Sequence, residues 1–333
     1  MDYVIQTINL TKKFGNFTAV DNLNLKIREG EIYGLLGPNG AGKTTTIKML
    51  STLLNLTEGQ ASVWGFDVLT QKDEVRSSIG IVFQEPALDS RLTGRENLDF
   101  HARLYGLDKK IRQKRIKEVL HLVDLEDKAD VLVQNYSGGM QRRLEVARGL
   151  MHCPKILFLD EPTLGLDAQT RRHIWEYIKE LNKKEKVTII LTTHYMEEAD
   201  YLCDRVAIID FGKIVALDKP ERLKNILGGD AISIEATPSE IALNVFQKLS
   251  WVKKIKEHDG LIDLTVEEGE KKIPLLIKID QKKEGFAIRS IKLREPTLED
   301  VFLHYTGKTI REAETNHTDK NRRRMRMRHR ARR

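Results

Sequence analysis

The chain has 333 residues, of which 40% are hydrophobic and 32% are charged, a composition typical of a globular protein. Its length suits about two domains. No apolar run approaches the roughly 20 residues of a transmembrane helix, so we expect any membrane role to depend on a partner. The net charge of +7 is concentrated at one end, because residues 318–333 contain nine Lys or Arg and one Asp. This distribution argues against a nucleic-acid-binding surface that covers the whole protein.

The first predicted elements are strands. Residues 3–10 and 20–28 alternate between apolar and polar side chains, which is typical of half-buried antiparallel strands. Residues 32–36 form a short apolar run that leads into a glycine-rich segment, and apolar residues at helical spacing follow it. The segment reads Gly37, Pro38, Asn39, Gly40, Ala41, Gly42, Lys43, Thr44, Thr45. The pattern predicts a strand, a loop and a helix in succession.

The glycine-rich loop matches the phosphate-binding pattern G-x-x-x-x-G-K-[ST]. Its glycines allow backbone N–H groups to surround phosphate oxygens, and the positive end of the next helix dipole favours the same anion. We expect Lys43 to contact the β- and γ-phosphates, Thr44 to bind Mg²⁺ and Thr45 to contact the α-phosphate. Such a loop occurs in GTPases, in helicases and in other classes of nucleotide-binding protein, so the loop alone does not identify the class.

A block with helical periodicity, about residues 88–150, interrupts the pattern of strands. Gln84 precedes it, after the strand-like residues 80–83. Within the block, Ser137 stands where an N-cap would, and Gly138 and Gly139 leave backbone donors uncovered at the start of a helix. The sequence therefore predicts a second anion site in a chain that already has one.

Strand-like runs resume at residues 156–159, 187–191, 206–209 and 213–217, so the helical block is inserted into an α/β core. Asp160 and Glu161 end the first of these runs. A carboxylate at that strand tip can hold Mg²⁺ through water, and its neighbour can polarise an attacking water. His194 follows the second run.

A second domain is predicted after Gly228 and Gly229. Residues 231–236 and 261–266 have the pattern of strands, and residues 239–249 that of a helix between them. A terminal helix is expected after Thr297, which has capping-box spacing to Asp300, and Gly307 suits its end. We therefore expect an α/β domain over residues 1–229, a small α+β accessory domain over 230–308 and a disordered basic tail over 309–333.

The order and spacing of these motifs over about residues 1–230 resemble the ATP-binding subunit of an ABC transporter. Residues 88–98 and 296–307 resemble the daunorubicin-resistance type. The resemblance implies a P-loop core with an antiparallel β subdomain, an inserted helical signature subdomain and a C-terminal accessory domain. It also implies that ATP and Mg²⁺ are bound.

Further roles follow from the resemblance alone. It makes Glu161, His194 and Gln84 catalytic: His194 contacts the γ-phosphate, and Gln84 senses Mg²⁺ and water and couples to the membrane subunit. Asp167 belongs to a loop that crosses the dimer interface. Phe14 stands where the family usually stacks a tyrosine on adenine; a place in the core is the alternative for this ring.

The same resemblance implies a head-to-tail pair of subunits, in which Ser137, Gly138 and Gly139 cap the ATP that the partner's glycine-rich loop holds. The family's usual signature, Leu-Ser-Gly-Gly-Gln, here begins with Tyr136 and ends with Met140. The end positions therefore differ, whereas the phosphate-facing residues are kept.

The function implied is ATP hydrolysis that drives an exporter of drugs, lipids or polysaccharides, at the cytoplasmic face of the membrane, through a separate integral permease. The Arg-rich tail would contact anionic lipid. The alternative is a soluble ABC-type ATPase that acts on nucleic acid or ribosomes through the tail. A chromosome ATPase would carry a long coiled coil and a translation-type protein two cassettes, and this sequence has neither feature. Nucleic acid is thus the less favoured partner.

Overall fold

The computed structural model describes residues 3–85, 87–258, 261–281, 285–294 and 296–307. Contacts divide the chain into a unit that runs through Lys219, here called the cassette, and a unit that begins at Pro220, here called the C-terminal unit. The division precedes Gly228 and Gly229, where composition had suggested a boundary, because the short helix α8 (Pro220–Asn225) belongs to the C-terminal unit. The predicted basic tail lies outside the described residues.

A six-stranded sheet forms the centre of the cassette, in the order β11-β10-β4-β9-β8-β7. Its parallel strands are β4 (Ile32–Leu36), β7 (Ile79–Val82), β8 (Ile156–Asp160), β9 (Thr188–Thr193) and β10 (Arg205–Asp210), and β11 (Lys213–Asp218) is antiparallel. Every residue of β4, β8 and β9 is buried, which explains their continuous apolar runs. The carboxyl ends of these three strands share one edge of the sheet, so the residues that follow them meet there.

A second, antiparallel sheet contains β1 (Ile5–Phe14), β2 (Phe17–Leu23), β3 (Lys26–Ile27), β5 (Glu58–Val63) and β6 (Phe66–Asp67). It shares a core with the central sheet: Leu10 and Val20 pack in one cluster with Leu35 and Phe158. The helix α1 (Lys43–Leu50) contributes Ile47 to the same cluster. The predicted antiparallel strands are confirmed.

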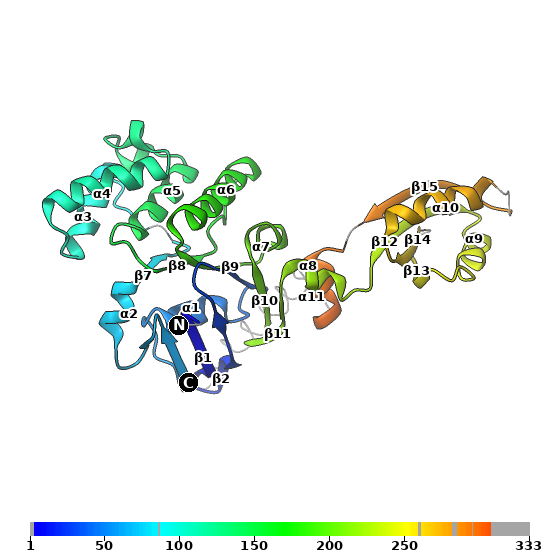
Figure 1. The fold of residues 1–333 in the computed structure, drawn as a ribbon, viewed down its shortest axis with the longest axis horizontal. Coiled ribbons are helices and arrows are strands. Elements are labelled where there is room, and N and C mark those ends of the chain that lie inside the picture. The colour runs from blue at the N-terminus through cyan, green and yellow to red at the C-terminus, as the bar shows by residue number, and fades with distance from the viewer. Residues whose placement is uncertain (1–2, 86, 259–260, 282–284, 295, 308–333) are drawn as a thin grey trace, which may run out of the picture. The chain divides into compact units, whose positions relative to one another are not determined.

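The predicted helical block consists of α3 (Gly94–Leu104), α4 (Lys109–Leu122) and α5 (Gly138–Gly149), with the short 3-10 turns η1 (Glu126–Lys128) and η2 (Val133–Asn135). Figure 1 shows these helices gathered apart from β1 and β2. A complete capping box at Thr93 and Glu96 starts α3. Three further helices complete the cassette: α2 (Lys72–Ser78), α6 (Ala168–Glu185) and α7 (Met196–Leu202). The insertion of a helical block into an α/β core is confirmed.

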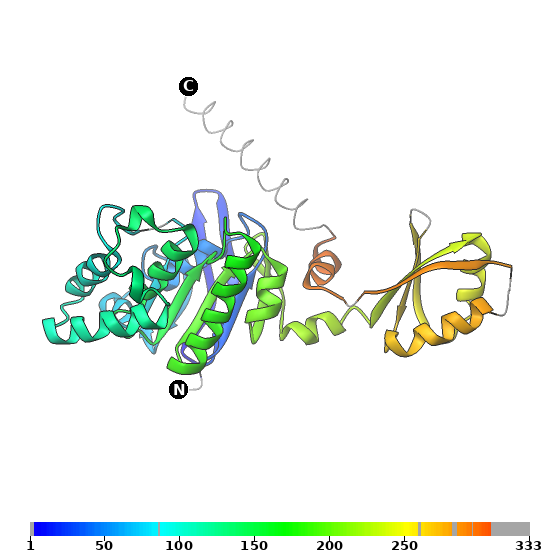
Figure 2. The ribbon, with the colours of Figure 1, turned by 90° about the horizontal axis from the view of Figure 1, so that it is seen from above.

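The C-terminal unit folds as a split β-α-β arrangement. Its elements are β12 (Asp230–Thr237), α9 (Ser239–Phe246), β13 (Val252–His258), β14 (Leu261–Val266), α10 (Gly269–Gln281) and β15 (Ala287–Arg294), and the strand order is β13-β14-β12-β15. Figure 2 shows α9 and α10 lying against these strands. The final helix α11 (Leu298–Thr306) has the predicted capping box at Thr297 and Asp300 and ends at Gly307, whose φ is 70°. No helix of the described residues combines the length and apolar character that a bilayer crossing requires.

Candidate active site

The glycine-rich loop turns sharply between β4 and α1. Gly40 and Gly42 have φ angles of 84° and 105°, in the left-handed region that favours glycine. A Cβ on Gly42 would lie 2.5 Å from the carbonyl oxygen of Ala19, so a side chain there would force the backbone apart. Gly42 is the N-cap of α1, and Lys43 is therefore the first residue of the helix.

The loop presents free backbone donors. Within the part of the chain that the structure describes, the N–H groups of Gly40, Gly42, Thr44 and Thr45 donate to no protein acceptor. Uncapped donors at the start of a helix are the usual receptor for a phosphate group. The loop therefore fits the polyphosphate ligand that its sequence predicts.

Lys43 is enclosed by the loop, with 4% of its surface exposed. Its Nζ donates to the carbonyl oxygens of Gly37 at 2.8 Å and Pro38 at 3.1 Å, and lies 3.4 Å from Oε1 of Glu161. A buried ammonium beside the free N–H groups makes this corner of the site strongly attractive to an anion.

Asp160 is the meeting point of two hydroxyl groups. Thr44 Oγ1 donates to Asp160 Oδ1 at 2.9 Å, and Thr192 Oγ1 donates to the same oxygen at 2.6 Å. Hydroxyl and carboxylate oxygens are the protein ligands that suit Mg²⁺. Thr192 was missed in the sequence; its only signal is that it is polar at the end of an apolar strand, two residues before His194.

Glu161 lies between a lysine and a histidine. His194 Nδ1 is 3.3 Å from Glu161 Oε1, the oxygen that Lys43 also approaches. Burial alone would raise the pKa of Glu161, but the hydrogen bond with His194 and the Lys43 charge outweigh it and lower the pKa below its usual value. The φ of Glu161 is 50°, uncommon for a residue with a side chain, and its N–H donates to Thr192 Oγ1 at 3.0 Å. The sheet thus holds an ionised carboxylate in a fixed orientation.

The second predicted anion site is a capped helix start. Ser137 is the N-cap of α5, as predicted, and its Oγ accepts from the N–H of Met140 at 3.3 Å. Gly139 packs on α6: a Cβ there would lie 2.5 Å from Cγ2 of Thr170, the residue that donates to the α6 N-cap Asp167. Among the described residues, no hydrogen bond joins Ser137 to the Lys43 and Glu161 cluster. One chain therefore does not bring its two anion sites into contact.

Two other predicted residues lie on the surface. Phe14 ends β1 with 42% of its surface exposed, and Lys12 Nζ lies 5.0 Å from the centre of its ring. The alternative of a core position for Phe14 is therefore wrong. Gln84 follows β7 and is exposed, and it forms no hydrogen bond to Thr44 or Asp160 within the described residues.

Arg142, on α5, was also missed. Its guanidinium is buried and donates to four carbonyl oxygens, those of Phe83, Asp160, Glu161 and Pro162. These contacts join Phe83, the residue before Gln84, to the end of β8, where the two acidic residues lie. Because every acceptor is a main-chain oxygen, the sequence of the partner segments gives no sign of the contact.

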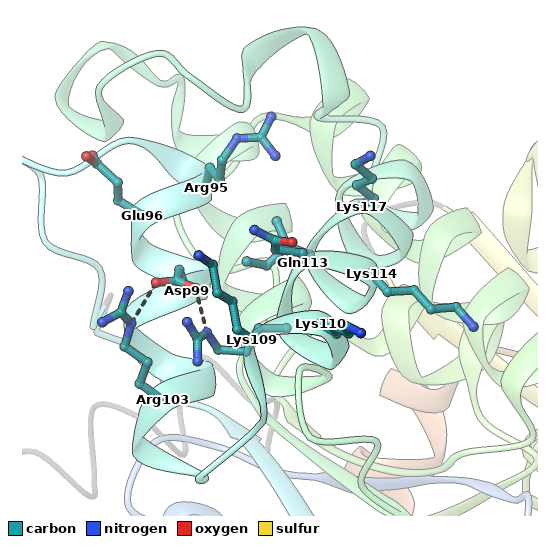
Figure 3. A pocket seen from close by; sticks show the side chains of 11 residues that line it. Arg95, Glu96, Asp99, Arg103, Lys109, Lys110, Gln113, Lys114 and Lys117 are labelled. Atoms are coloured by element: carbon teal, nitrogen blue, oxygen red, sulfur yellow. Dashed lines mark hydrogen bonds and ion pairs between the residues drawn. The ribbon is translucent and has the colours of Figure 1, made fainter.

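A basic groove lies between α3 and α4, with a cavity volume of about 830 Å³ (Figure 3). Arg103 and Arg112 both bind Asp99, at 2.8 and 2.7 Å. Lys109, Lys110 and Lys117 pair with no carboxylate in the part of the chain that the structure describes. None of the predicted site residues lines this groove, so it is separate from the candidate active site.

Two family models match the chain. The model described as ABC transporter matches residues 20–164, and the model described as ATP-binding protein DrrA1-3-like, C-terminal domain, matches residues 219–306. The second match begins at Lys219, one residue before the start of the C-terminal unit.

Curated relatives match over nearly the whole chain. It is 40% identical to the daunorubicin resistance ATP-binding protein DrrA2 of Streptomyces coeruleorubidus, over 92% of this chain and 95% of that protein. It is also 40% identical to the linearmycin resistance ATP-binding protein LnrL of Bacillus subtilis, over 93% of this chain and 100% of that protein. Among solved structures, the dimeric post-hydrolysis state of the ATP-binding cassette MJ0796, bound to ADP and Pi, is 31% identical with a TM-score of 0.58, over 65% of this chain and 98% of that one.

Proposed function

Because this chain belongs to the family of ABC transporter ATP-binding proteins, of the daunorubicin-resistance type, we propose that Lys43, Asp160, Glu161 and His194 form its site of ATP hydrolysis. The chain is an ATP-hydrolysing subunit of an ABC transporter. The observation that carries the site assignment is made at the carboxyl ends of β4, β8 and β9, where Lys43 and His194 both approach Glu161 and Thr44 binds Asp160.

The phosphate chain is held by residues 37–45. The N–H groups of the loop surround the β- and γ-phosphates, Lys43 turns from the carbonyls of Gly37 and Pro38 toward them, and Thr45 contacts the α-phosphate. Phe14 is exposed and stacks on adenine. A bound Mg²⁺ neutralises charge on the phosphate oxygens. Thr44 and Asp160, which are already joined by a hydrogen bond, would be its protein ligands together with Gln84.

Glu161 accepts the proton of the attacking water. Its lowered pKa keeps the side chain ionised at neutral pH, and its bond with His194 fixes the direction of the carboxylate. His194 then lies where it reaches the γ-phosphate. Thr192 holds both the Asp160 side chain and the Glu161 main chain, so the two acidic residues keep separate roles.

The site is completed by a second copy of the chain. Ser137, Gly138 and Gly139 form a helix start that this chain does not use for its own loop, and they cap the ATP of a head-to-tail partner. Asp167 lies at the adjacent start of α6 and belongs to the same interface. The dimeric form of a similar cassette with bound ADP and Pi supports this arrangement.

The working partner is an integral membrane permease at the cytoplasmic face of the membrane, and the cargo is exported. The relatives' names refer to resistance to daunorubicin and linearmycin, which supports export of a drug; lipids and polysaccharides are the other cargo classes that we propose. Co-purification of the tagged chain from detergent-solubilised membranes, followed by mass spectrometry, tests this proposal. A membrane protein recovered with the wild-type chain supports it, and exclusive recovery of ribosomal proteins or nucleic acid contradicts it.

The alternative is a soluble ABC-type ATPase that acts on nucleic acid through the Arg-rich tail, residues 318–333. An ATPase assay with and without RNA or DNA separates the two functions. A rate unchanged by nucleic acid favours the transporter subunit. Strong stimulation that depends on the tail favours the alternative.

Anionic lipid is the second partner that we propose for the tail, because nine clustered basic residues stand in a chain that works beside a membrane. Truncation after Thr318 weakens salt-sensitive binding to vesicles that contain phosphatidylglycerol and leaves ATPase activity intact. The variant with Lys109, Lys110 and Lys117 changed to Gln measures any contribution of the α3–α4 groove. The matched control replaces three exposed lysines of α6 and its C-cap: Lys183, Lys184, Lys186.

A further inference from the structure

Arg142 is a buried cation whose hydrogen-bond acceptors are main-chain oxygens, not carboxylates. It is 9% exposed, and no described carboxylate forms an ion pair with it. Nε donates to Pro162 O at 2.7 Å, Nη1 to Phe83 O at 2.5 Å, and Nη2 to Asp160 O and Glu161 O, both at 3.1 Å. The planar fork of a guanidinium is the only side-chain group that can donate in so many fixed directions at once.

These acceptors belong to two segments that carry catalytic residues. Phe83 directly precedes Gln84, whereas Asp160 ends β8 and Glu161 and Pro162 open the turn after it. One side chain of α5 therefore fixes the main chain of both. Hydrogen bonds of a charged donor are stronger than those between neutral groups, and four of them come from one planar group, so the two segments are held together at fixed positions.

Glu145, one turn further along α5, holds Ala87, three residues after Gln84. Its Oε1 accepts from the N–H of Ala87 at 2.5 Å, and its Oε2 is fixed by Arg148 at 2.8 Å. The Glu145 side chain is 1% exposed, so its carboxylate is held inside the protein beside the exposed Ala87. The helix α5, whose N-cap is Ser137, thus forms hydrogen bonds on both sides of Gln84, at Phe83 and at Ala87.

We infer that Arg142 is a positioning residue that links the two ATP sites of the dimer. The inference rests on the proposed head-to-tail function, in which the start of α5 serves the partner's ATP while Glu161 serves the chain's own. A displacement of α5 on contact with the partner's γ-phosphate is passed by Arg142 to the main chain of Glu161 and Phe83. Coupling of this kind needs a rigid element that touches both sites, and α5 with Arg142 is such an element.

The neighbouring residue provides a matched control. Arg143 lies on the same helix and also donates to main-chain oxygens, those of Val123 at 2.9 Å and Asp124 at 3.1 Å. Both acceptors follow α4, so Arg143 connects α5 to another part of the helical block and not to β8 or to Phe83. Arg142→Gln and Arg143→Gln remove the same chemical group one residue apart and differ in what they disconnect.

The test measures ATP binding, steady-state ATPase rates over a range of ATP concentrations, and thermal unfolding of the full chain and its variants. Arg142→Gln leaves the Kd for ATP within about twofold, since the glycine-rich loop does not touch it, and lowers kcat by roughly tenfold or more. It also lowers the Hill coefficient toward that of independent sites. Arg143→Gln keeps the wild-type kcat and Hill coefficient, even where its unfolding temperature falls.

Arg142→Lys serves as the second variant, because it keeps a buried cation and folds even if the Gln variant does not. One ammonium cannot reach both segments, so its Hill coefficient also falls. A wild-type Hill coefficient and kcat in Arg142→Lys or Arg142→Gln, in a chain that still dimerises with ATP, overturn the role of Arg142 alone. Absence of ATP-dependent dimerisation in Glu161→Gln, in which the bound ATP is not hydrolysed, overturns the head-to-tail function and this inference together.

Discussion

Glu161 and His194 face each other across the ends of two adjacent parallel strands, with Oε1 of the glutamate 3.3 Å from Nδ1 of the histidine. The contact needs no flexible loop of its own, because β8 and β9 are fully buried and in register up to the pair Asp160 and Thr192. The orientation of the carboxylate is therefore set by the sheet.

The contact gives the reaction a defined dependence on pH. Above the pKa of Glu161 the ionised carboxylate accepts a proton from water, and activity is lost as the pH falls through that pKa. In His194→Ala the pKa of Glu161 rises, because burial is then opposed by Lys43 with no help from His194. The acid limb of the kcat profile should move to higher pH. His121→Ala, at an exposed site on α4, is the control, and an unmoved limb in His194→Ala would contradict the contact.

Glu161→Gln should bind ATP and Mg²⁺ and hydrolyse slowly. The amide keeps the shape of the side chain but cannot accept a proton from water, so kcat should fall by about a hundredfold or more. The unhydrolysed nucleotide should hold two chains together, and light scattering should show a dimer with ATP and a smaller species with ADP. Adding Ser137→Arg should abolish that association. The composite site is refuted for the isolated subunit if nucleotide leaves its association unchanged.

Lys43→Ala should abolish productive nucleotide binding. The substitution removes the enclosed ammonium that lies beside the free N–H groups of the loop. Binding of a fluorescent ATP analogue and the ATPase rate should both be lost. The control is Lys48→Ala, which changes an exposed lysine of the same helix. Full activity in Lys43→Ala would mean that the phosphate site is elsewhere.

Gly139→Ala should destabilise the cassette, whereas Gly138→Ala should not. The added Cβ at residue 139 would meet Cγ2 of Thr170 at 2.5 Å, and at residue 138 it would meet Leu166 at an ordinary 3.6 Å. Thr170→Ser removes the methyl group and keeps the hydroxyl that binds Asp167, so it should restore the unfolding temperature of Gly139→Ala. Calorimetry on the two single variants and the double variant checks this. Equal unfolding temperatures for both alanine variants would exclude the clash.

The central strands and the active-site loop could be predicted because their signals are local. Residues 32–36 and 156–159 are continuous apolar runs next to glycine or acidic residues, and the structure buries each of them. The capping box at Thr297 and Asp300 was equally readable. Thr192 and Arg142 could not be placed, because their partners lie 32 and 59 residues away at Asp160 and Phe83.

The C-terminal unit was only partly predicted. Strands β13 and β15 lie at the two edges of their sheet and carry several lysines and arginines, as edge strands often do, so their apolar alternation is weak. The helix α10 contains Pro274, which in a sequence argues against a helix interior. Only the buried strands β12 and β14 kept a clear pattern.

In chain order, β12 is the first strand of this sheet and β15 is the last, and the two are hydrogen-bonded neighbours with Ala231 opposite Arg294. The helices that precede and follow the sheet, α8 and α11, pack on each other. The chain therefore enters and leaves the sheet at neighbouring points. Because the two ends of the segment between Gly229 and Thr297 are neighbours, the segment can be replaced or lengthened in evolution while α8 and α11 stay in contact. The elements between these two points can thus vary in length and sequence while the chain keeps the same entry and exit, which the pairing of Ala231 with Arg294 sets.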